Sequence, residues 1–135
     1  MKKFGIVVSE FNSEYTNKLL ESCLRSFKEE NIEPVIYRVP GAVEIPIACQ
    51  EMIFEEKIDA IVTLGVVIKG ETEHYEYVCN MCTQGITQLS LKYNIPIVFE
   101  VLMADTDQKI IDRLDKGYEA AKTAIKMSKL INTKL

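Results

Sequence analysis

The stretch Ala60-Ile61-Val62-Thr63-Leu64-Gly65-Val66-Val67 is apolar throughout except for one threonine and one glycine. A strand without alternation of polar and apolar side chains is typical of a parallel sheet that helices cover on both faces. We therefore predict that this stretch is a central strand. The segment from Tyr75 to Tyr93 has apolar residues at helical spacing, which predicts a helix after the strand.

The same alternation of strand and helix extends in both directions along the chain. Further strands are predicted at Lys3 to Val8, Pro34 to Val39 and Ile95 to Leu102. Further helices are predicted at Ser13 to Glu30, Ile45 to Glu56 and Asp107 to Leu130. The last helix is expected to bury one apolar face, formed by Ile110, Ile111, Leu114, Tyr118, Ala121 and Ile125.

This order of elements predicts the fold class. Strands that alternate regularly with helices indicate an α/β domain with a four-stranded parallel sheet, right-handed crossovers and helices on both faces. A chain of 135 residues, of which 47% are hydrophobic, can bury one core of ordinary size. We expect residues 1–135 to form a single domain.

The composition argues against several classes of function. The chain has 16 basic and 20 acidic residues, and its longest run of basic residues is Lys2-Lys3, which argues against nucleic-acid binding. No apolar run approaches the roughly 20 residues that a membrane span needs. No secretory pattern precedes Phe4, so we expect a cytoplasmic protein.

The four cysteines are Cys23, Cys49, Cys79 and Cys82, and all fall in predicted helices. Their spacing is not that of a secreted disulfide framework. Cys79 and Cys82 form a Cys-x-x-Cys pair, but in the middle of a helix and with only His74 nearby as a further ligand. We therefore expect reduced, buried thiols and no metal site.

Ligands of parallel α/β sheets bind beyond the carboxyl ends of the strands. Here those segments are Ser9 to Ser13, Val39 to Glu44, Gly65 to His74 and Phe99 to Thr106. In the third, Gly65 and Gly70 have the spacing of a nucleotide P-loop, but Glu71 replaces the lysine of that motif, which argues against nucleoside triphosphates. The turn Gly70-Glu71-Thr72 can bind a smaller anion at the following helix start, or can simply begin that helix.

Four side chains near these segments each have a binding and a structural interpretation. His74 can exchange protons at neutral pH, although a solitary histidine is more often structural. Phe11 can stack on a planar heterocycle or pack on its own helix. Glu44 can accept hydrogen bonds from ligand hydroxyls or stabilise a helix start. Arg113 can clamp a phosphate or form a solvated ion pair.

Four segments in order resemble the 6,7-dimethyl-8-ribityllumazine synthase family. They are Glu10-Phe11-Asn12, Val39 to Pro46, Leu64 to Val78 and Pro96 to Leu102. The resemblance covers nearly the whole chain and implies a three-layer flavodoxin-like sandwich. It also implies a transferase of riboflavin biosynthesis, which condenses 5-amino-6-(D-ribitylamino)uracil with 3,4-dihydroxy-2-butanone 4-phosphate. The reaction releases phosphate and water and uses no metal or redox cofactor.

The resemblance implies contacts to the pyrimidine substrate. Phe11 is expected to stack on the ring, and the Glu44 carboxylate to accept hydrogen bonds from ribityl hydroxyls. The backbone after the central strand is expected to line the ring pocket. The residues given these contacts by the resemblance are Phe11, Ala42, Val43, Glu44, Val66, Val67 and Ile68.

The resemblance also implies how the second substrate is bound. Gly70, Glu71 and Thr72 are expected to receive the ketone phosphate, and His74 to shuttle protons. Phe99 and Arg113 are expected to reach the site from a neighbouring subunit, with Arg113 on the phosphate, and Lys116 resembles a family lysine near the ribityl chain. The implied assembly is a homo-oligomer, either a pentamer or an icosahedral shell of pentamers. This chain departs from the family in a shorter connection from Arg113 to Gly117.

Two other functions are compatible with parts of this pattern. Archaeal-type riboflavin synthases share the implied fold and dismutate the lumazine, and a non-catalytic lumazine- or flavin-binding protein would keep only the stacking pocket. The segments Phe11-Asn12, Pro40-Gly41-Ala42 and Glu71-x-x-His74-Tyr75 favour lumazine synthase over the first. His74 and Arg113 argue against the second, because a pure binder needs neither a proton shuttle nor a phosphate clamp.

Overall fold

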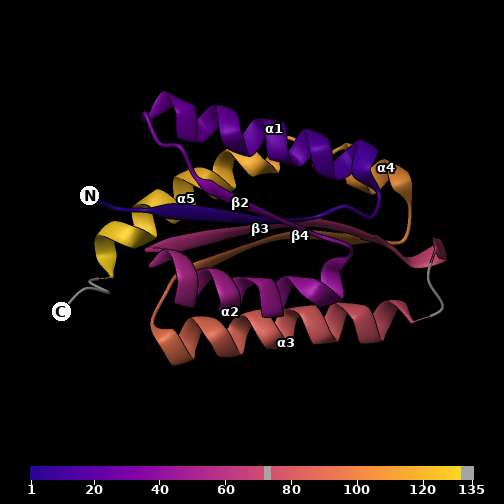
Figure 1. Ribbon diagram of the computed structural model, residues 1–135. Helices are drawn as coiled ribbons and strands as arrows, with labels where there is room; N and C mark the ends of the chain where they lie inside the picture. Colours follow the sequence, from indigo (N-terminus) through magenta and orange to yellow (C-terminus); the bar gives the residue numbers. More distant parts are fainter. Residues whose placement is uncertain (72–73, 132–135) are drawn as a thin grey trace.

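Four parallel strands form one sheet in the order β2-β1-β3-β4 (Figure 1). The structure is a computed structural model that describes residues 1–71 and 74–131. The elements in chain order are β1 (Phe4–Ser9), α1 (Ser13–Glu29), β2 (Val35–Val39), η1 (Ala42–Glu44), α2 (Ile45–Glu56), β3 (Ala60–Ile68), η2 (Lys69–Glu71), α3 (Tyr75–Tyr93), β4 (Ile97–Ala104), α4 (Asp107–Ile111) and α5 (Lys116–Leu130). The predicted α/β class with a four-stranded parallel sheet is confirmed.

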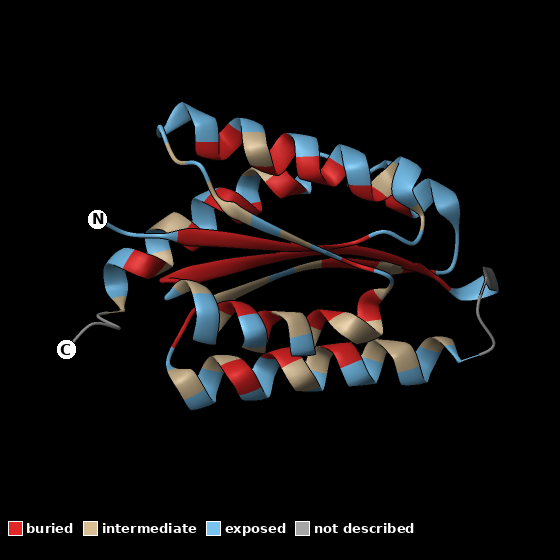
Figure 2. Ribbon diagram, in the orientation of Figure 1, coloured by how far each residue is buried: buried red, intermediate tan, exposed pale blue. Residues whose placement is uncertain are grey.

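Helices cover both faces of the sheet and give three layers. Helices α1, α4 and α5 lie on one face, and α2 and α3 lie on the other (Figure 1). The central strands β1 and β3 are buried along their whole length (Figure 2), as the unbroken apolar sequence of β3 predicts. The edge strands β2 and β4 are buried only in part.

Successive residues of each strand contribute to opposite faces, so the sheet separates two apolar cores. Under α1 and α5 the core includes Phe27, Leu19 and Leu64, and under α2 and α3 it includes Ile45 and Met52. Together these cores hold the central strands, whose carboxyl ends carry the segments expected to bind ligands. In the part of the chain that the structure describes, no helix is long and apolar enough to cross a membrane.

Three of the cysteines are buried as predicted, and Cys79 is only partly buried. Burial is the largest cause that raises the pKa of the Cys23 thiol to about 12, with a smaller contribution from the charge of Glu100. Burial likewise raises the pKa of the Cys82 thiol to about 12, with a smaller contribution from Cys79. These thiols are therefore protonated at neutral pH and pack as small apolar groups.

The prediction of one helix from Asp107 to Leu130 is wrong, because the structure has α4 and α5 separated by a turn over residues 112–115. In that turn the amides of Arg113 and Lys116 donate to carbonyls three residues earlier, so the α-helical hydrogen-bond pattern is interrupted. The interruption changes the direction in which side chains point. Ile111 is 45% exposed and does not join the buried face to which it was assigned.

Candidate functional site

After the neighbouring strands β1 and β3, the chain continues to opposite faces of the sheet. These neighbouring strands are central in the sheet, but β1 leads into α1 on one face and β3 leads into α3 on the other (Figure 1). Connections that leave to opposite faces open a crevice between the two strand ends, which is where open α/β sheets bind ligands. The segment after β1 holds Phe11, and the segment after β3 leads to His74.

A pocket of about 240 Å³ occupies this crevice. Its lining residues come from the segments after β1 and β2, from the end of β3 and from the first turns of α3. They are Phe11, Gly41, Ala42, Val43, Val66, Val67, Ile68 and Val78. The structure thus brings together six of the residues that the sequence predicted for the pyrimidine substrate. Gly41 and Val78 were not predicted, although Val78 follows His74 by one helical turn.

The Phe11 ring lines the pocket and is 58% exposed. The buried face of α1 is formed by other residues, among them Leu19, Cys23 and Phe27. This arrangement favours the stacking interpretation of Phe11 over packing on its own helix. Its backbone is fixed to the next loop, because the Phe11 amide donates to the Pro40 carbonyl at 2.9 Å.

Strand β3 extends beyond β1 at the pocket. The register pairs β1 with β3 as far as Val8 and Leu64, whereas β3 continues to Ile68 beside β4 alone. Asn12 takes the place of a continued β1, since its Nδ2 donates to the Val66 carbonyl at 3.1 Å. Alternate residues of a strand direct their backbone groups to the same side, so the Ile68 N–H, like the Val66 carbonyl, points to the side of β3 that β1 leaves unpaired. A flat heterocycle can therefore find backbone hydrogen bonds opposite the Phe11 ring.

Glu44 stabilises a helix start, which is the structural one of its two predicted roles. Its Oε1 accepts a hydrogen bond from the Gly41 amide at 2.9 Å, which holds the short helix η1. This bond places Ala42 and Val43 in the pocket wall. A carboxylate has a second oxygen and several lone pairs, so this bond is compatible with a contact to a ligand hydroxyl.

His74 is exposed and is the N-cap residue of α3. Its carbonyl accepts from the amide of Val78 at 2.9 Å, which places it one turn from a residue of the pocket wall. Its ring centroid lies 6.1 Å from that of Tyr77. Thr72 lies outside the described residues, and Glu71 is described only by its backbone.

The two glycines that suggested a P-loop do not form one. Gly65 lies within β3, where an added Cβ would meet Ser9 Oγ at 2.9 Å. Gly70 lies in η2, where an added Cβ would meet no atom within 4 Å. Residues 65–68 belong to the strand β3 and do not form the Gly-rich loop of that motif, which agrees with the missing lysine.

Phe99, Arg113 and Lys116 do not line this pocket. Phe99 lies on the edge strand β4, is 38% exposed, and borders a separate hollow of about 400 Å³. Arg113 and Lys116 are exposed around another hollow of about 360 Å³. Burial raises the pKa of the Glu100 carboxyl, and the charges of Lys116 and Arg113 act to lower it, so both cations lie near β4.

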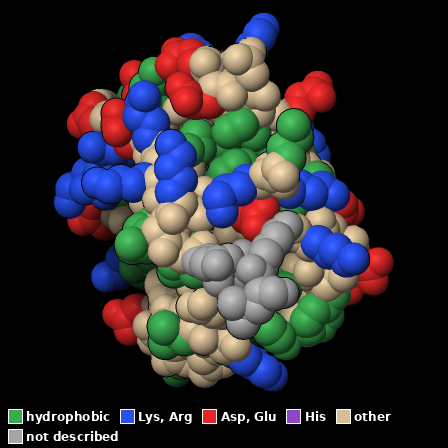
Figure 3. Space-filling model, turned by 90° about the vertical axis from the view of Figure 1, so that its left-hand side faces the viewer, with side chains coloured by type: hydrophobic (Ala, Val, Ile, Leu, Met, Phe, Trp, Pro, Cys, Tyr) green, Lys and Arg blue, Asp and Glu red, His purple; other side chains and the backbone are tan. Residues whose placement is uncertain are grey.

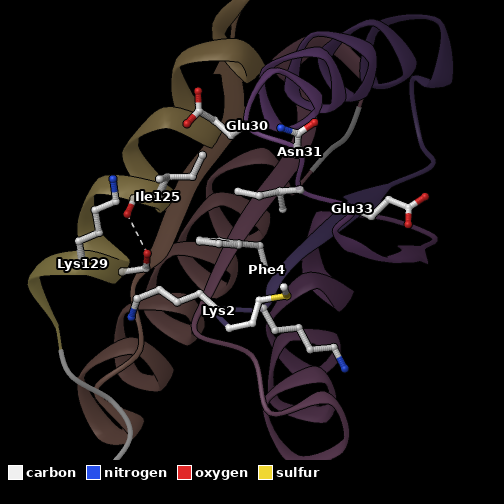
Figure 4. A pocket seen from close by; sticks show the side chains of 11 residues that line it. Lys2, Phe4, Glu30, Asn31, Glu33, Ile125 and Lys129 are labelled. Carbon is white, nitrogen blue, oxygen red and sulfur yellow. Dashed lines mark hydrogen bonds between the residues drawn. The ribbon is translucent and has the colours of Figure 1, made fainter.

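A larger cavity of about 670 Å³ lies at the opposite end of the sheet, where the strands begin. Figure 3 shows the side of the molecule with this end, and Figure 4 shows Phe4 at the centre of the cavity, between Lys129 and Glu33. Helices α1 and α5 end here, so their carbonyl ends face the cavity and disfavour anions. The cavity at the carboxyl ends of β1 and β3 is the better candidate for the functional site.

Comparison with known proteins shows the family of this chain. The chain matches the family model for 6,7-dimethyl-8-ribityllumazine synthase over residues 1–132. It is 43% identical to the 6,7-dimethyl-8-ribityllumazine synthase of Parabacteroides distasonis, in an alignment that covers 91% of this chain and 82% of that protein.

Proposed function

Because this chain belongs to the 6,7-dimethyl-8-ribityllumazine synthase family, we propose that the pocket beside Phe11 is the pyrimidine-binding half of its active site. The enzyme is a transferase of riboflavin biosynthesis and forms 6,7-dimethyl-8-ribityllumazine. Its substrates are 5-amino-6-(D-ribitylamino)uracil and 3,4-dihydroxy-2-butanone 4-phosphate. The proposal concerns which residues bind them and where the complete site is formed.

The observation that carries the proposal is an exposed aromatic ring opposite the end of β3. This end of the strand is paired with β4 on one side and is not paired with β1 on the other. Phe11 supplies the ring, and β3 from Val66 to Ile68 supplies the backbone groups. A pyrimidine has two flat faces for stacking and an edge of donors and acceptors for the backbone. The ribityl chain then extends toward Ala42, Val43 and Glu44.

The ketone phosphate is proposed to bind at the turn Gly70-Glu71-Thr72, in front of α3. The first amides of a helix have no partner within it and favour an anion, which suits the phosphate group. His74 is placed at the start of the same helix and exchanges protons during imine formation, phosphate elimination and ring closure. His74→Ala is expected to slow turnover while substrate binding is mostly kept, and unchanged turnover would remove His74 from the mechanism.

We further propose that Phe99 and Arg113, with Lys116, complete the site of a neighbouring subunit. None of the three is among the residues that line the pocket of their own chain, which supports this assignment. The exposed apolar side chain of Leu91, which borders the same hollow as Phe99, supports a covered surface there.

An interface between two different surfaces of the same chain is heterologous, and it forms a ring where the rotation from one subunit to the next closes. A pentamer, alone or within an icosahedral shell, has this geometry. We place the enzyme in the cytoplasm, in keeping with the free thiols of Cys23, Cys49, Cys79 and Cys82.

The activity is tested by mixing the purified protein with both substrates and following lumazine absorbance and phosphate release. Formation of both products in equal amounts is expected. Binding of lumazine without turnover would instead indicate a binding protein. Conversion of lumazine alone to riboflavin would indicate the archaeal-type synthase activity.

A further inference from the structure

We propose that Asn12 is a positioning residue that fixes the spacing between the Phe11 ring and the free side of β3. The inference rests on the proposed function, since it concerns the same pyrimidine pocket. Asn12 directly follows Phe11, and its side-chain Nδ2 donates to the Val66 carbonyl at 3.1 Å. This bond joins the two walls between which the pyrimidine is placed.

The amide of Asn12 does not cap its own helix. Asn12 is the N-cap residue of α1, a position at which asparagine ordinarily accepts a hydrogen bond from an amide of the first turn. Here the side chain makes no such capping bond. Its bond reaches instead across 54 positions of sequence to β3. The side chain therefore serves the contact with the neighbouring strand rather than the helix start.

The backbone of Asn12 is fixed from several directions. Its carbonyl accepts from the amides of Tyr15 at 2.9 Å and Thr16 at 3.0 Å, which ties it to α1. The preceding amide, of Phe11, donates to the Pro40 carbonyl after β2. Residues 11 and 12 are thus joined to α1, to the loop after β2 and, through the Asn12 side chain, to β3.

Few residue types can meet both requirements at position 12. The backbone has φ 62° and ψ 46°, a left-handed conformation that glycine, asparagine and aspartate adopt at least cost. Glycine has no side chain to reach Val66. Aspartate would place a carboxylate oxygen, which cannot donate, against the Val66 carbonyl. Among these three residue types, asparagine alone combines the conformation with a side-chain donor.

The test compares Asn12→Gly and Asn12→Asp with the same substitutions at Asn94. Asn94 is a matched control, because it is also left-handed, with φ 54°, but is exposed at the end of α3. Steady-state kinetics with each substrate varied in turn, lumazine binding by fluorescence and thermal unfolding are measured for all four variants. Wild-type turnover is measured alongside, so that a failure of the proposed function is recognised separately.

Both Asn12 variants are expected to raise the KM for the pyrimidine and the Kd for lumazine about tenfold, as expected for one lost hydrogen bond between the walls. The KM for the ketone phosphate is expected to change less than twofold by comparison. The Asn94 variants are expected to leave both KM values unchanged. A merely structural role would lower the melting temperature without separating the two substrates.

The proposal is overturned if wild-type enzyme is active and the Asn12 variants keep the wild-type pyrimidine KM. It is also overturned if both KM values rise equally. Loss of the folded protein in both Asn12 variants, with folded Asn94 variants, would assign Asn12 to stability alone and would equally contradict the proposal.

Discussion

At the scale of single residues, the site includes an apolar side chain that is exposed to solvent and so gives up stabilisation that burial would provide. The Phe11 ring is 58% exposed, although a phenylalanine gains most when it is removed from water. An aromatic ring with one face open is suited to stacking on a second ring. Its exposure also means that removing it should not disturb the fold.

Phe11→Ala is therefore expected to weaken lumazine binding by about 1–3 kcal/mol, the range for one base stacked on an aromatic ring. That loss corresponds to roughly 5- to 150-fold in Kd. The melting temperature is expected to stay at the wild-type value. Fluorescence titration and thermal unfolding measure the two quantities. Phe54→Ala is the matched control, because Phe54 is 53% exposed but contacts Tyr93 outside the pocket; equal binding losses in both variants would refute stacking at Phe11.

Arg113→Ala is expected to raise the KM for the ketone phosphate at least tenfold and to change the pyrimidine KM little, since a guanidinium binds phosphate by charge and paired hydrogen bonds. Arg113 is exposed, so stability is expected to be unaffected. Arg38→Ala serves as the control, because Arg38 is also exposed but lies on β2. Equal losses for both substrates at Arg113 would contradict the phosphate clamp.

The predicted strand ends located the segments that form the pocket. Within these segments, ring chemistry pointed to Phe11, and the family resemblance pointed to Ala42 and Val66. Neither predicted Gly41 or Val78, whose place in the wall depends on how the segments after different strands meet. The role of Asn12 is also invisible in the sequence. An asparagine before a helix predicts a cap, and only the hydrogen bond in the structure shows that its amide reaches Val66.

At the scale of elements, apolar patterning predicted every strand and the helices α1, α2 and α3, because each buries one continuous surface. It failed between α4 and α5. Ile110, Leu114 and Tyr118 keep helical spacing across the turn, so periodicity alone cannot reveal the break. The cause is tertiary, since Leu114 and Gly117 meet α1. The Leu114 carbonyl accepts from Ser22 Oγ at 3.3 Å.

Gly117 lets the first turn of α5 approach α1 closely. A Cβ at this position would lie 2.2 Å from the Leu19 carbonyl oxygen and 2.5 Å from Ser22 Oγ. Gly117→Ala is therefore expected to lower the free energy of unfolding by about 1–3 kcal/mol, as for an overpacked site. Denaturant unfolding measures this change. Gly70→Ala is the stability control, because its Cβ would meet nothing within 4 Å; wild-type stability of Gly117→Ala would show that the two helices can separate at little cost.

At the scale of the whole molecule, the proposed function divides the site into two half-sites on different parts of one chain. One is the pocket with Phe11 at the carboxyl ends of β1 and β3, together with His74, which lies one helical turn before Val78 of the pocket wall. The other comprises Phe99 and Arg113, which border two separate hollows near the edge strand β4. A ring of identical subunits can join the first half-site of each subunit to the second of its neighbour. The fold alone could not show this, because one chain contains no copy of its neighbour.

The most direct test of this shared site is activity in mixed oligomers. Phe11→Ala and Arg113→Ala chains are coexpressed in equal amounts, and lumazine formation per subunit is compared with that of each variant alone. A site with Phe11 from one subunit and Arg113 from the next predicts that about a quarter of the wild-type activity returns by random mixing. Phe11→Ala mixed with His74→Ala is the control and is expected to recover none, because both residues belong to the same half-site. Activity of the first mixture no higher than that of its separate variants would contradict a site built from two subunits.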